Sequence, residues 1–245
     1  MKIATQPGVN PLDTLSAHTE NIARASRGQS RRVGAAARDF GIRHLALPCV
    51  SDGYHKLNTV GGSWDTLIDT ASSDSVRAAD NTFWVRLASD SVTDQWDDLY
   101  RAFAYWDLRG FMRAESIVRE ARLVVRVQDR PSNDFSSSLV LCAAPAADPP
   151  PPVSADFNDY GSVEFGKARL AFSDFTAAEP KTAFFNLNDE GIAHIDTTGH
   201  FGFGFKIDHD FDDVEPTWVS VDSSSIEIQT LDDAKPCWLE LVYHY

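Results

Sequence analysis

The chain has 245 residues, enough for one large all-β domain or two small ones, and a folded chain of this size buries roughly 75% of its unfolded surface, so its stability requires neither a disulfide nor a metal. The net charge of −14 at pH 7 disfavours nucleic acid as the main partner. The cysteines, Cys49, Cys142 and Cys237, are widely spaced and form no Cys-x-x-Cys pair, which gives no support for a zinc knuckle or a disulfide framework.

The first 47 residues form a basic segment that we interpret as an N-terminal arm. Seven Lys and Arg residues against three acidic residues give this segment a charge of +4, so residues 48–245 carry −18. Apolar residues share one face over residues 13–27 and Gly28 follows them, which predicts one short helix. The start has no apolar stretch typical of a signal peptide, and no run of about 18 apolar residues occurs, so we expect a soluble protein made in the host cytoplasm.

Five arginines of the arm are candidate partner-binding residues. The arm has few apolar side chains with which to build a core, so we expect it to become ordered only against a partner surface, such as an acidic protein surface or nucleic acid. The alternative is a solvated arm that binds nothing. The five candidates are Arg24, Arg27, Arg31, Arg32 and Arg38.

From Leu45 onward the apolar residues alternate with a period of two, which indicates β-strands. Four consecutive prolines at 149–152 cannot pair within a sheet, so they predict an exposed, stiff loop. Many short strands with almost no helix predict an all-β fold, a jelly-roll β-sandwich over residues 48–245. The main predicted strands are residues 82–87, 99–108, 116–127, 168–173, 182–187, 200–208, 217–221, 225–229 and 237–245.

The patterns of three strands predict how they face the core. Over residues 99–108, odd and even positions lie on opposite faces. Over residues 116–127, Glu120, Arg122 and Arg126 face water while Ile117, Ala121, Leu123, Val125 and Val127 point inward, so we expect an antiparallel sheet with one wet face. Over residues 200–208 the phenylalanines point one way, and Gly202 and Gly204 leave the other face bare. Before that strand, residues 189–195 read as a capped helical turn that docks through Ile192 and Ile195, and Gly199 suits a positive φ in the following turn.

Two clusters resemble metal sites. His194, Asp196 and His200 lie within seven residues, but their spacing is not a usual zinc spacing. We expect the two rings to point in unrelated directions as ordinary histidines at the rim of the sheet, with a zinc site as the alternative. The second cluster has aspartates at alternate positions, which suits calcium, but it lacks the glycine and terminal glutamate of a calcium loop. We therefore favour a solvated acidic edge formed by Asp208, Asp210, Asp212 and Asp213.

No Gly-x-Ser-x-Gly, phosphate-binding loop or His-Glu-x-x-His motif occurs in the sequence. Carboxylates are plentiful, but nothing singles out a pair with the roles of a glycosidase. We therefore expect no enzymatic activity and no cofactor.

Three stretches together resemble the DNRLRE-type jelly rolls, which are also grouped with carbohydrate-binding modules of family 96. The first stretch joins an aromatic-Asp-Leu strand to an Ala-x-Leu strand, the second is the turn and Phe-Gly strand after Asn188, and the third is the last strand. Lys206 stands where arginine is more usual. The matching residues are Arg101, Phe103, Trp106, Asp107, Leu108, Ile117, Ala121, Leu123, Asn188, Gly191, Ile195, Gly199, Phe203, Asp208, Pro236, Leu239, Leu241 and Tyr243.

The resemblance covers residues 64–245 and implies a jelly roll that binds or builds and does not catalyse. Such domains occur as sugar-binding modules of secreted enzymes, in surface adhesins, and as parts of phage and virus particles. The missing signal and the basic arm favour a virion structural protein, a capsid decoration, head-fibre or tail component of a bacteriophage-like particle. It would sit in the virion as a homo-oligomer bound to capsid or tail subunits, without a membrane.

The alternative is a carbohydrate-binding, lectin-like module or surface adhesin with a glycan ligand. Aromatic side chains on an exposed sheet face stack on sugar rings, although aromatic residues within alternating strands more often belong to the core. The tryptophans available for such a face are Trp84, Trp96, Trp106, Trp218 and Trp238.

Overall fold

The computed structural model describes residues 42–78, 82–146, 150–175, 180–229 and 237–245. The β-domain spans Arg43–Tyr245. Its first strand, β1 (Arg43–Pro48), pairs with the last strand, so the domain begins inside the segment that we interpreted as the arm. The helix predicted over residues 13–27 and the five arginines of the arm lie outside the described residues. In the part of the chain that the structure describes, no helix combines the length and apolar character needed to cross a membrane.

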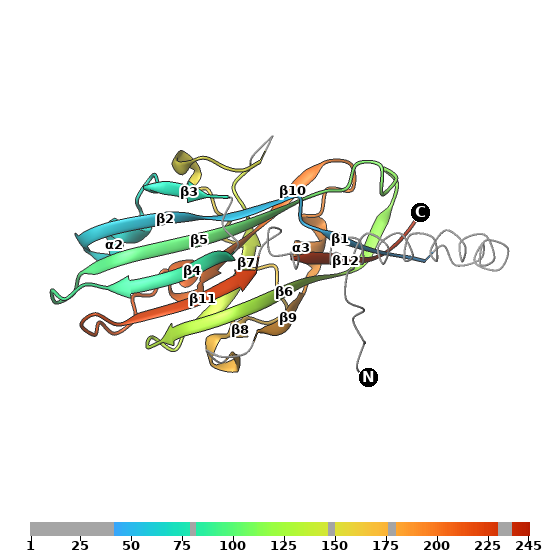
Figure 1. Ribbon diagram of the computed structural model, residues 1–245. Helices are drawn as coiled ribbons and strands as arrows, with labels where there is room; N and C mark the ends of the chain where they lie inside the picture. The colour runs from blue at the N-terminus through green and yellow to red at the C-terminus, as the bar shows by residue number, and fades with distance from the viewer. Residues whose placement is uncertain (1–41, 79–81, 147–149, 176–179, 230–236) are drawn as a thin grey trace, which may run out of the picture. The chain divides into compact units, whose positions relative to one another are not determined.

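One curled sheet of antiparallel strands forms the domain (Figure 1). Its strand order is β1-β12-β6-β11-β4-β5-β10-β7-β8, while β2 pairs with β3 and β5, and β9 pairs with β6. The remaining strands are β2 (Ser51–Gly62), β3 (Ser75–Arg77), β4 (Thr82–Ser89), β5 (Trp96–Asp107), β6 (Ile117–Asn133), β7 (Ser138–Ala143), β8 (Leu170–Ala171), β9 (Lys181–Asn186), β10 (His200–Ile207), β11 (Ser223–Gln229) and β12 (Trp238–His244).

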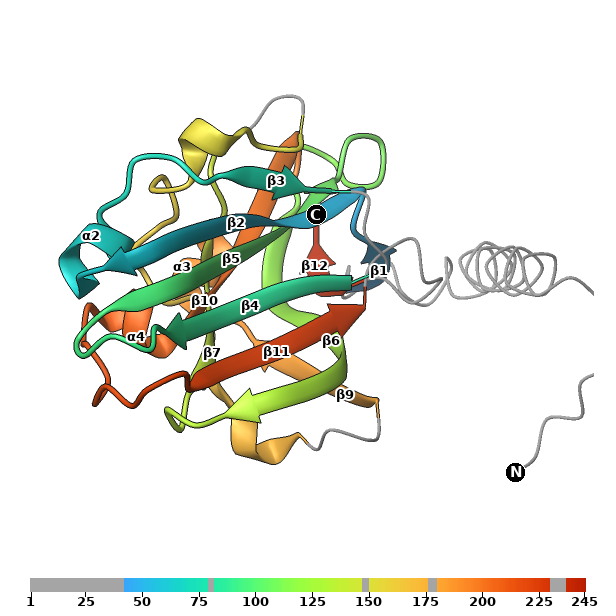
Figure 2. The same cartoon turned by 60° about the vertical axis from the view of Figure 1, so that its left-hand side comes forward.

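The curl brings the sheet into two facing layers. Figure 2 shows β2, β5, β4, β11 and part of β6 side by side in front of β10 and β7. Three short α-helices join the strands: α2 (Trp64–Ile68), α3 (Asp189–Ala193) and α4 (Asp208–Asp212). The predicted all-β jelly-roll sandwich is therefore confirmed for the β-domain.

Several predicted strands differ in detail. Residues 168–173 contain only the two-residue β8 before a 3-10 turn at Phe172–Asp174. Residues 217–221 form no strand, because Val221 adopts a positive φ of 60° and both Val219 and Val221 face solvent. Strands β2, β3 and β7 were not among the predicted strands. The helical turn was predicted correctly: the Asn188 side chain caps α3 by accepting from the Gly191 N–H at 2.9 Å.

The wet face predicted for residues 116–127 is present on β6, where Glu120 and Arg122 are exposed, whereas the second half of β5 is buried on both faces. Phe103 and Tyr105 are buried, because the chain after β7 crosses this face of the sheet. The Tyr160 hydroxyl lies 3.1 Å from the Arg101 carbonyl oxygen, and the Tyr105 hydroxyl donates to the Pro145 carbonyl at 2.7 Å. A layer that includes Tyr105 and Tyr160 therefore covers β5 on the side away from the main core.

The same layer overturns the expectation of a bare glycine face on β10. A Cβ on Gly202 would lie 2.5 Å from Cε1 of Tyr105, and one on Gly204 would lie 2.6 Å from Cδ1 of Tyr160. Both distances are shorter than any normal carbon–carbon contact. The glycines therefore make room for two rings that lie directly on the strand backbone.

Candidate functional site

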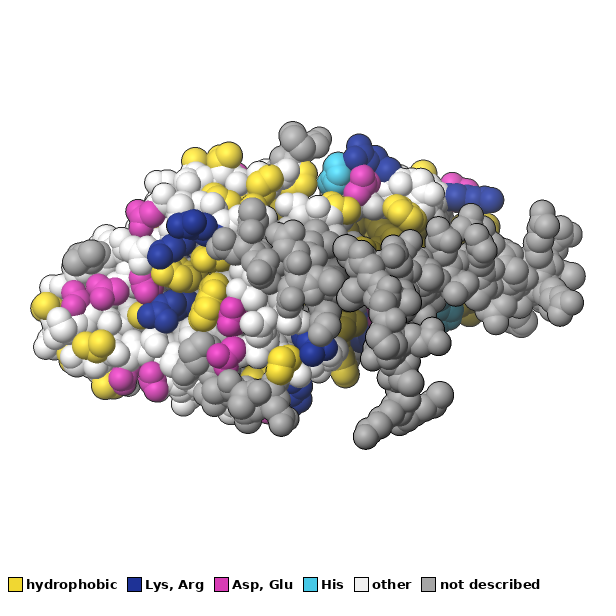
Figure 3. All heavy atoms as spheres, in the orientation of Figure 1, with side chains coloured by type: hydrophobic (Ala, Val, Ile, Leu, Met, Phe, Trp, Pro, Cys, Tyr) yellow, Lys and Arg dark blue, Asp and Glu magenta, His cyan; other side chains and the backbone are white. Residues whose placement is uncertain are grey.

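His194, Asp196 and His200 line one cleft of about 610 Å³ at the ends of β5 and β10. Figure 3 shows histidine, basic and acidic side chains gathered at the upper edge of the molecule, over these strand ends. The two imidazoles nonetheless have separate partners: Nε2 of His194 bonds the Gly202 carbonyl at 2.8 Å, whereas Nε2 of His200 lies 3.2 Å from Asp107 Oδ2. Among the described residues, no group of three His, Cys, Asp or Glu side chains is placed to hold a metal ion.

Each side chain of this cleft is held by its own local structure. Because a carbonyl oxygen only accepts, His194 donates from Nε2, and burial lowers the pKa of its ring below the ordinary value. Asp196 accepts from the Thr198 amide at 2.7 Å and its hydroxyl at 2.8 Å, and these hydrogen bonds lower the pKa of the carboxyl. Gly199 does not have the predicted positive φ; a Cβ there would lie 2.4 Å from the Asp196 carboxylate.

The other wall of the cleft carries an ion pair. Arg109 grips the Asp107 carboxylate with Nε at 2.9 Å and Nη2 at 2.7 Å, and Nη2 also lies 3.0 Å from Nε2 of His200. Hydrogen bonds from Arg109 hold the pKa of Asp107 far below its usual range. At this wall of the cleft the Arg109 guanidinium is neutralised by the Asp107 carboxylate.

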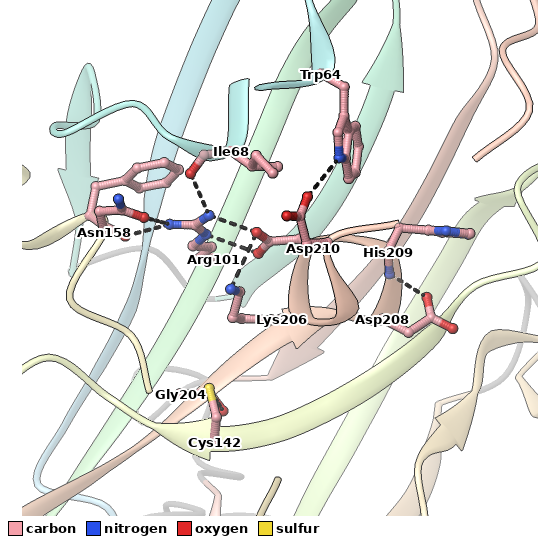
Figure 4. Close-up of polar contacts among 12 residues, drawn as sticks. Trp64, Ile68, Arg101, Cys142, Asn158, Gly204, Lys206, Asp208, His209 and Asp210 are labelled. Atoms are coloured by element: carbon pink, nitrogen blue, oxygen red, sulfur yellow. Dashed lines mark hydrogen bonds and ion pairs between the residues drawn. The ribbon is translucent and has the colours of Figure 1, made fainter. Parts of the chain in front are cut away.

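The predicted acidic edge is solvated only in part: Asp212 and Asp213 are exposed, whereas Asp210 turns into the domain. Asp210 is buried and forms a fork-shaped ion pair with Arg101, and the Lys206 ammonium lies 3.3 Å away (Figure 4). Burial alone would raise the pKa of the Asp210 carboxyl, but the two cations outweigh it and hold the pKa below its ordinary value. Of the neighbouring aspartates, Asp212 bonds Arg169 at 2.8 Å and Asp213 accepts from Trp64 Nε1 at 3.2 Å.

Arg101 connects four parts of the domain. Besides Asp210 on α4, its guanidinium donates to the carbonyl oxygens of Phe157 at 2.7 Å and Ile68 at 3.2 Å, and to Asn158 Oδ1 at 3.2 Å (Figure 4). The guanidinium carbon of Arg101 lies 4.3 Å from the centroid of the Phe157 ring. With its donors satisfied inside the protein, Arg101 stabilises the packing of β5, α2 and α4 and is not available to a ligand.

Only one of the five candidate tryptophans is exposed. Trp96 and Trp106 are fully buried, and Trp84 and Trp218 are partly buried against the core. Trp238 on β12 keeps 37% of its surface exposed. A sugar-stacking surface would therefore centre on Trp238.

Trp238 belongs to a row of three side chains that crosses three neighbouring strands, which we call the aromatic row. Trp238 on β12 lies opposite Val124 on β6, and Val124 lies opposite Phe184 on β9, which is 48% exposed. The residues that follow or precede them, Leu239, Leu123 and Phe185, are buried. Since successive side chains alternate across a strand, the aromatic row faces outward.

A polar row runs beside the aromatic row, one step along each strand. Arg122 on β6 lies opposite Glu240 on β12 and Asn186 on β9. Nε of Arg122 donates to Glu240 Oε2 at 2.9 Å, and its guanidinium carbon lies 5.1 Å from the centroid of the Phe184 ring. Two exposed aromatic rings and a set of donors and acceptors thus share one outward face of the sheet.

Sequence reasoning named Trp238 but missed Phe184 and Arg122. One local signal was present: Phe184 and Phe185 are adjacent in a strand, so only one of them can face the core. The partnership with Trp238 has no local signal, because β6, β9 and β12 are far apart in the chain.

A scan against protein-family models and a search of the curated proteins both gave no match. The resemblance to DNRLRE-type jelly rolls therefore stays a prediction. Solved structures similar to this chain include a xylan-binding module, CBM15, at 14% identity and a TM-score of 0.39, covering 82% of this chain and 97% of that one. A mutant of Xylanase10C from Cellvibrio japonicus in complex with xylopentaose aligns at 14% identity and a TM-score of 0.37, over 80% of this chain and 28% of that one.

Proposed function

We propose that this chain is a non-catalytic carbohydrate-binding module that holds a polysaccharide on the aromatic row. The observation that carries the proposal is the exposure of Trp238 and Phe184 on one face, in register on either side of Val124. A contiguous exposed apolar patch on a folded protein marks an interaction site with a ligand or another protein.

The geometry suits an extended sugar chain. The backbones of Trp238 and Phe184 are two strand spacings apart, roughly 9.6 Å. Two sugar rings of one polysaccharide that runs across the strands can therefore stack on the two aromatic side chains. The apolar faces of the sugar rings would cover Trp238 and Phe184. Hydroxyl groups at the ring edges would meet Arg122, Glu240 and Asn186 in the polar row.

The proposal is tested by affinity electrophoresis and calorimetry with a panel of soluble polysaccharides, with xylan among them. Trp238→Ala and Phe184→Ala should each weaken binding about tenfold or more, the size expected for a central aromatic contact. The matched control is Phe111→Ala, which removes another exposed aromatic side chain, 57% exposed, from the turn after β5. Equal binding by all three variants, or binding of no polysaccharide in the panel, contradicts the proposal.

The predicted virion role and virion location stay predictions. They rest on the arm, whose candidate residues Arg24, Arg27, Arg31, Arg32 and Arg38 lie outside the described residues, and no contact among the described residues bears on them. Homo-oligomerisation and binding to capsid or tail subunits have the same standing. Co-sedimentation of the full chain with purified particles, compared at low and high salt, tests them separately from glycan binding.

A further inference from the structure

Arg126 lies beside the aromatic row, on the opposite side from Arg122. It is two residues beyond Val124 on β6, so its side chain points to the same face. Opposite it on β9 stands Thr182. Because Val124 pairs with both Trp238 and Phe184, Arg126 is a diagonal neighbour of both aromatic residues, within reach of a long side chain.

No residue that the structure describes accepts a hydrogen bond from the guanidinium of Arg126. Its Nε is shielded from solvent and has no hydrogen-bond partner, and the structure shows no ion pair between Arg126 and a described carboxylate. Arg122, the other arginine of this face, is instead neutralised by Glu240. The two terminal nitrogens of the Arg126 guanidinium are not shielded from solvent in the way that its Nε is, and no described residue accepts from them. They can therefore donate to an acidic group of a ligand.

The local charge around the aromatic row has the sign that an anion requires. Among the described residues that are next to the row on its three strands, Arg122 and Arg126 stand against Glu240, a net charge of +1, within a chain of net charge −14. A guanidinium is planar and always charged, and its forked donors match the paired oxygens of an acidic group. The acidic remainder of the domain would keep anionic polymers away from other surfaces.

We infer that the polysaccharide is anionic, with a uronate carboxylate or a sulfate ester placed at Arg126. This inference rests on the proposed function, because it assigns a ligand class to the same aromatic row. In this arrangement Trp238 and Phe184 stack on the sugar rings, Arg122 and Glu240 meet hydroxyl groups, and Arg126 selects for charge.

Two matched polymer pairs test the inference: polygalacturonate against its methyl ester, and a sulfated galactan against its desulfated form. Within each pair the backbone is the same and only the charge differs. The wild-type protein should bind at least one charged form about tenfold more tightly than its neutral partner at low salt. That advantage should shrink between about 0.01 and about 0.1 M salt, as the screening length falls from about 30 Å to about 10 Å.

Arg126→Gln should remove the advantage of the charged form over the neutral form. Arg126→Lys keeps the charge but loses the fork, so part of the advantage should remain. The matched control is Arg113→Gln, which removes an exposed arginine from the segment after β5 and should keep the full advantage. Thermal melting of each variant verifies that it is folded.

The possible failures are distinguishable. Equal binding of charged and neutral forms, lost in both on Trp238→Ala, overturns the inference and leaves the proposed function intact. An advantage that persists in Arg126→Gln overturns the role of Arg126. Absence of binding to all four polymers and to every other polysaccharide tested overturns both proposals. Which pair shows the advantage distinguishes a carboxylate from a sulfate.

Discussion

Arg101 and Asp210 form a two-pronged ion pair inside the sandwich, with Nε–Oδ2 at 2.9 Å and Nη2–Oδ1 at 2.6 Å. Their side chains keep only 2% and 0% of their surfaces exposed. They are 109 residues apart in the sequence and join β5 to α4. Since Lys206 also contacts Asp210, one carboxylate is shared by two cations at this point.

Removing the Asp210 charge should destabilise the domain strongly. Asp210→Asn leaves Arg101 as a buried charge without its partner, which costs about 3–5 kcal/mol. The exposed Asp212, which pairs with Arg169, is the control, and Asp212→Asn should cost under about 1 kcal/mol. Urea unfolding measures both free energies of unfolding, and similar losses in the two variants would contradict the structural role of the pair.

Gly204→Ala should destabilise the domain through a clash between side chains. The new Cβ would lie 2.6 Å from the Tyr160 ring and 2.8 Å from the Ala143 carbonyl oxygen, and overpacking of this kind costs about 1–3 kcal/mol. Gly110→Ala is the control because no atom lies within 4 Å there, although its φ of +79° still makes alanine unfavourable. The larger fall in melting temperature should belong to Gly204→Ala, and the reverse order would show that Tyr160 does not lie on the strand.

Stability should fall as the pH drops below about 6.5, the ordinary pKa of histidine. Burial lowers the pKa of both His55 and His194 in the folded protein. The unfolded chain therefore takes up protons first, so the stabilisation is complete above pH 6.5 and is lost as the pH falls through the folded pKa values. Urea midpoints between pH 5 and pH 8 measure this slope, and His55→Gln should flatten it; an unchanged slope would count against His55.

The three thiols should not react in the folded protein. Cys49, Cys142 and Cys237 are buried, and burial raises the pKa of Cys142 to about 12. The reactive form is the thiolate, so Ellman's reagent at pH 8 should detect almost no thiol in the native chain and all three after unfolding in urea. Rapid labelling of one thiol under native conditions would show that its strand opens to solvent.

Local patterns in the sequence predicted the strands that have one buried face, because alternation is a property of each strand alone. The phenylalanines of β10 and the alternation of β6 are examples. The cap at Asn188 was predictable for the same reason. What could not be predicted depends on contacts between distant segments. The sequence around Asp210 is rich in aspartate, which predicts an exposed segment. The Asp210 side chain turns inward because it pairs with the buried Arg101, which is 109 residues away in the sequence.

The candidate site shows the same division. Trp238 was one of five tryptophans, and nothing near it in sequence distinguishes it from the buried Trp96 and Trp106. Its exposure follows from the position of β12 in the sheet, and its partners Phe184 and Arg122 come from two other strands. His194 and His200 were predicted to be rim histidines whose rings point in unrelated directions, and their rings have separate partners at the rim. The sequence did not show that they line one cleft together with Asp196.

The position of β6 has a consequence for how binding activity arises during synthesis. This strand is 17 residues long and pairs with β12 on one edge and β9 on the other. The aromatic row therefore exists only after β12, which follows all the other strands in the chain, has joined the sheet. Such distant pairings form slowly compared with local ones. Nascent chains that lack β12, and chains cleaved before Trp238, should be unable to bind the polysaccharide. Polysaccharide binding would therefore report complete folding of the whole sandwich.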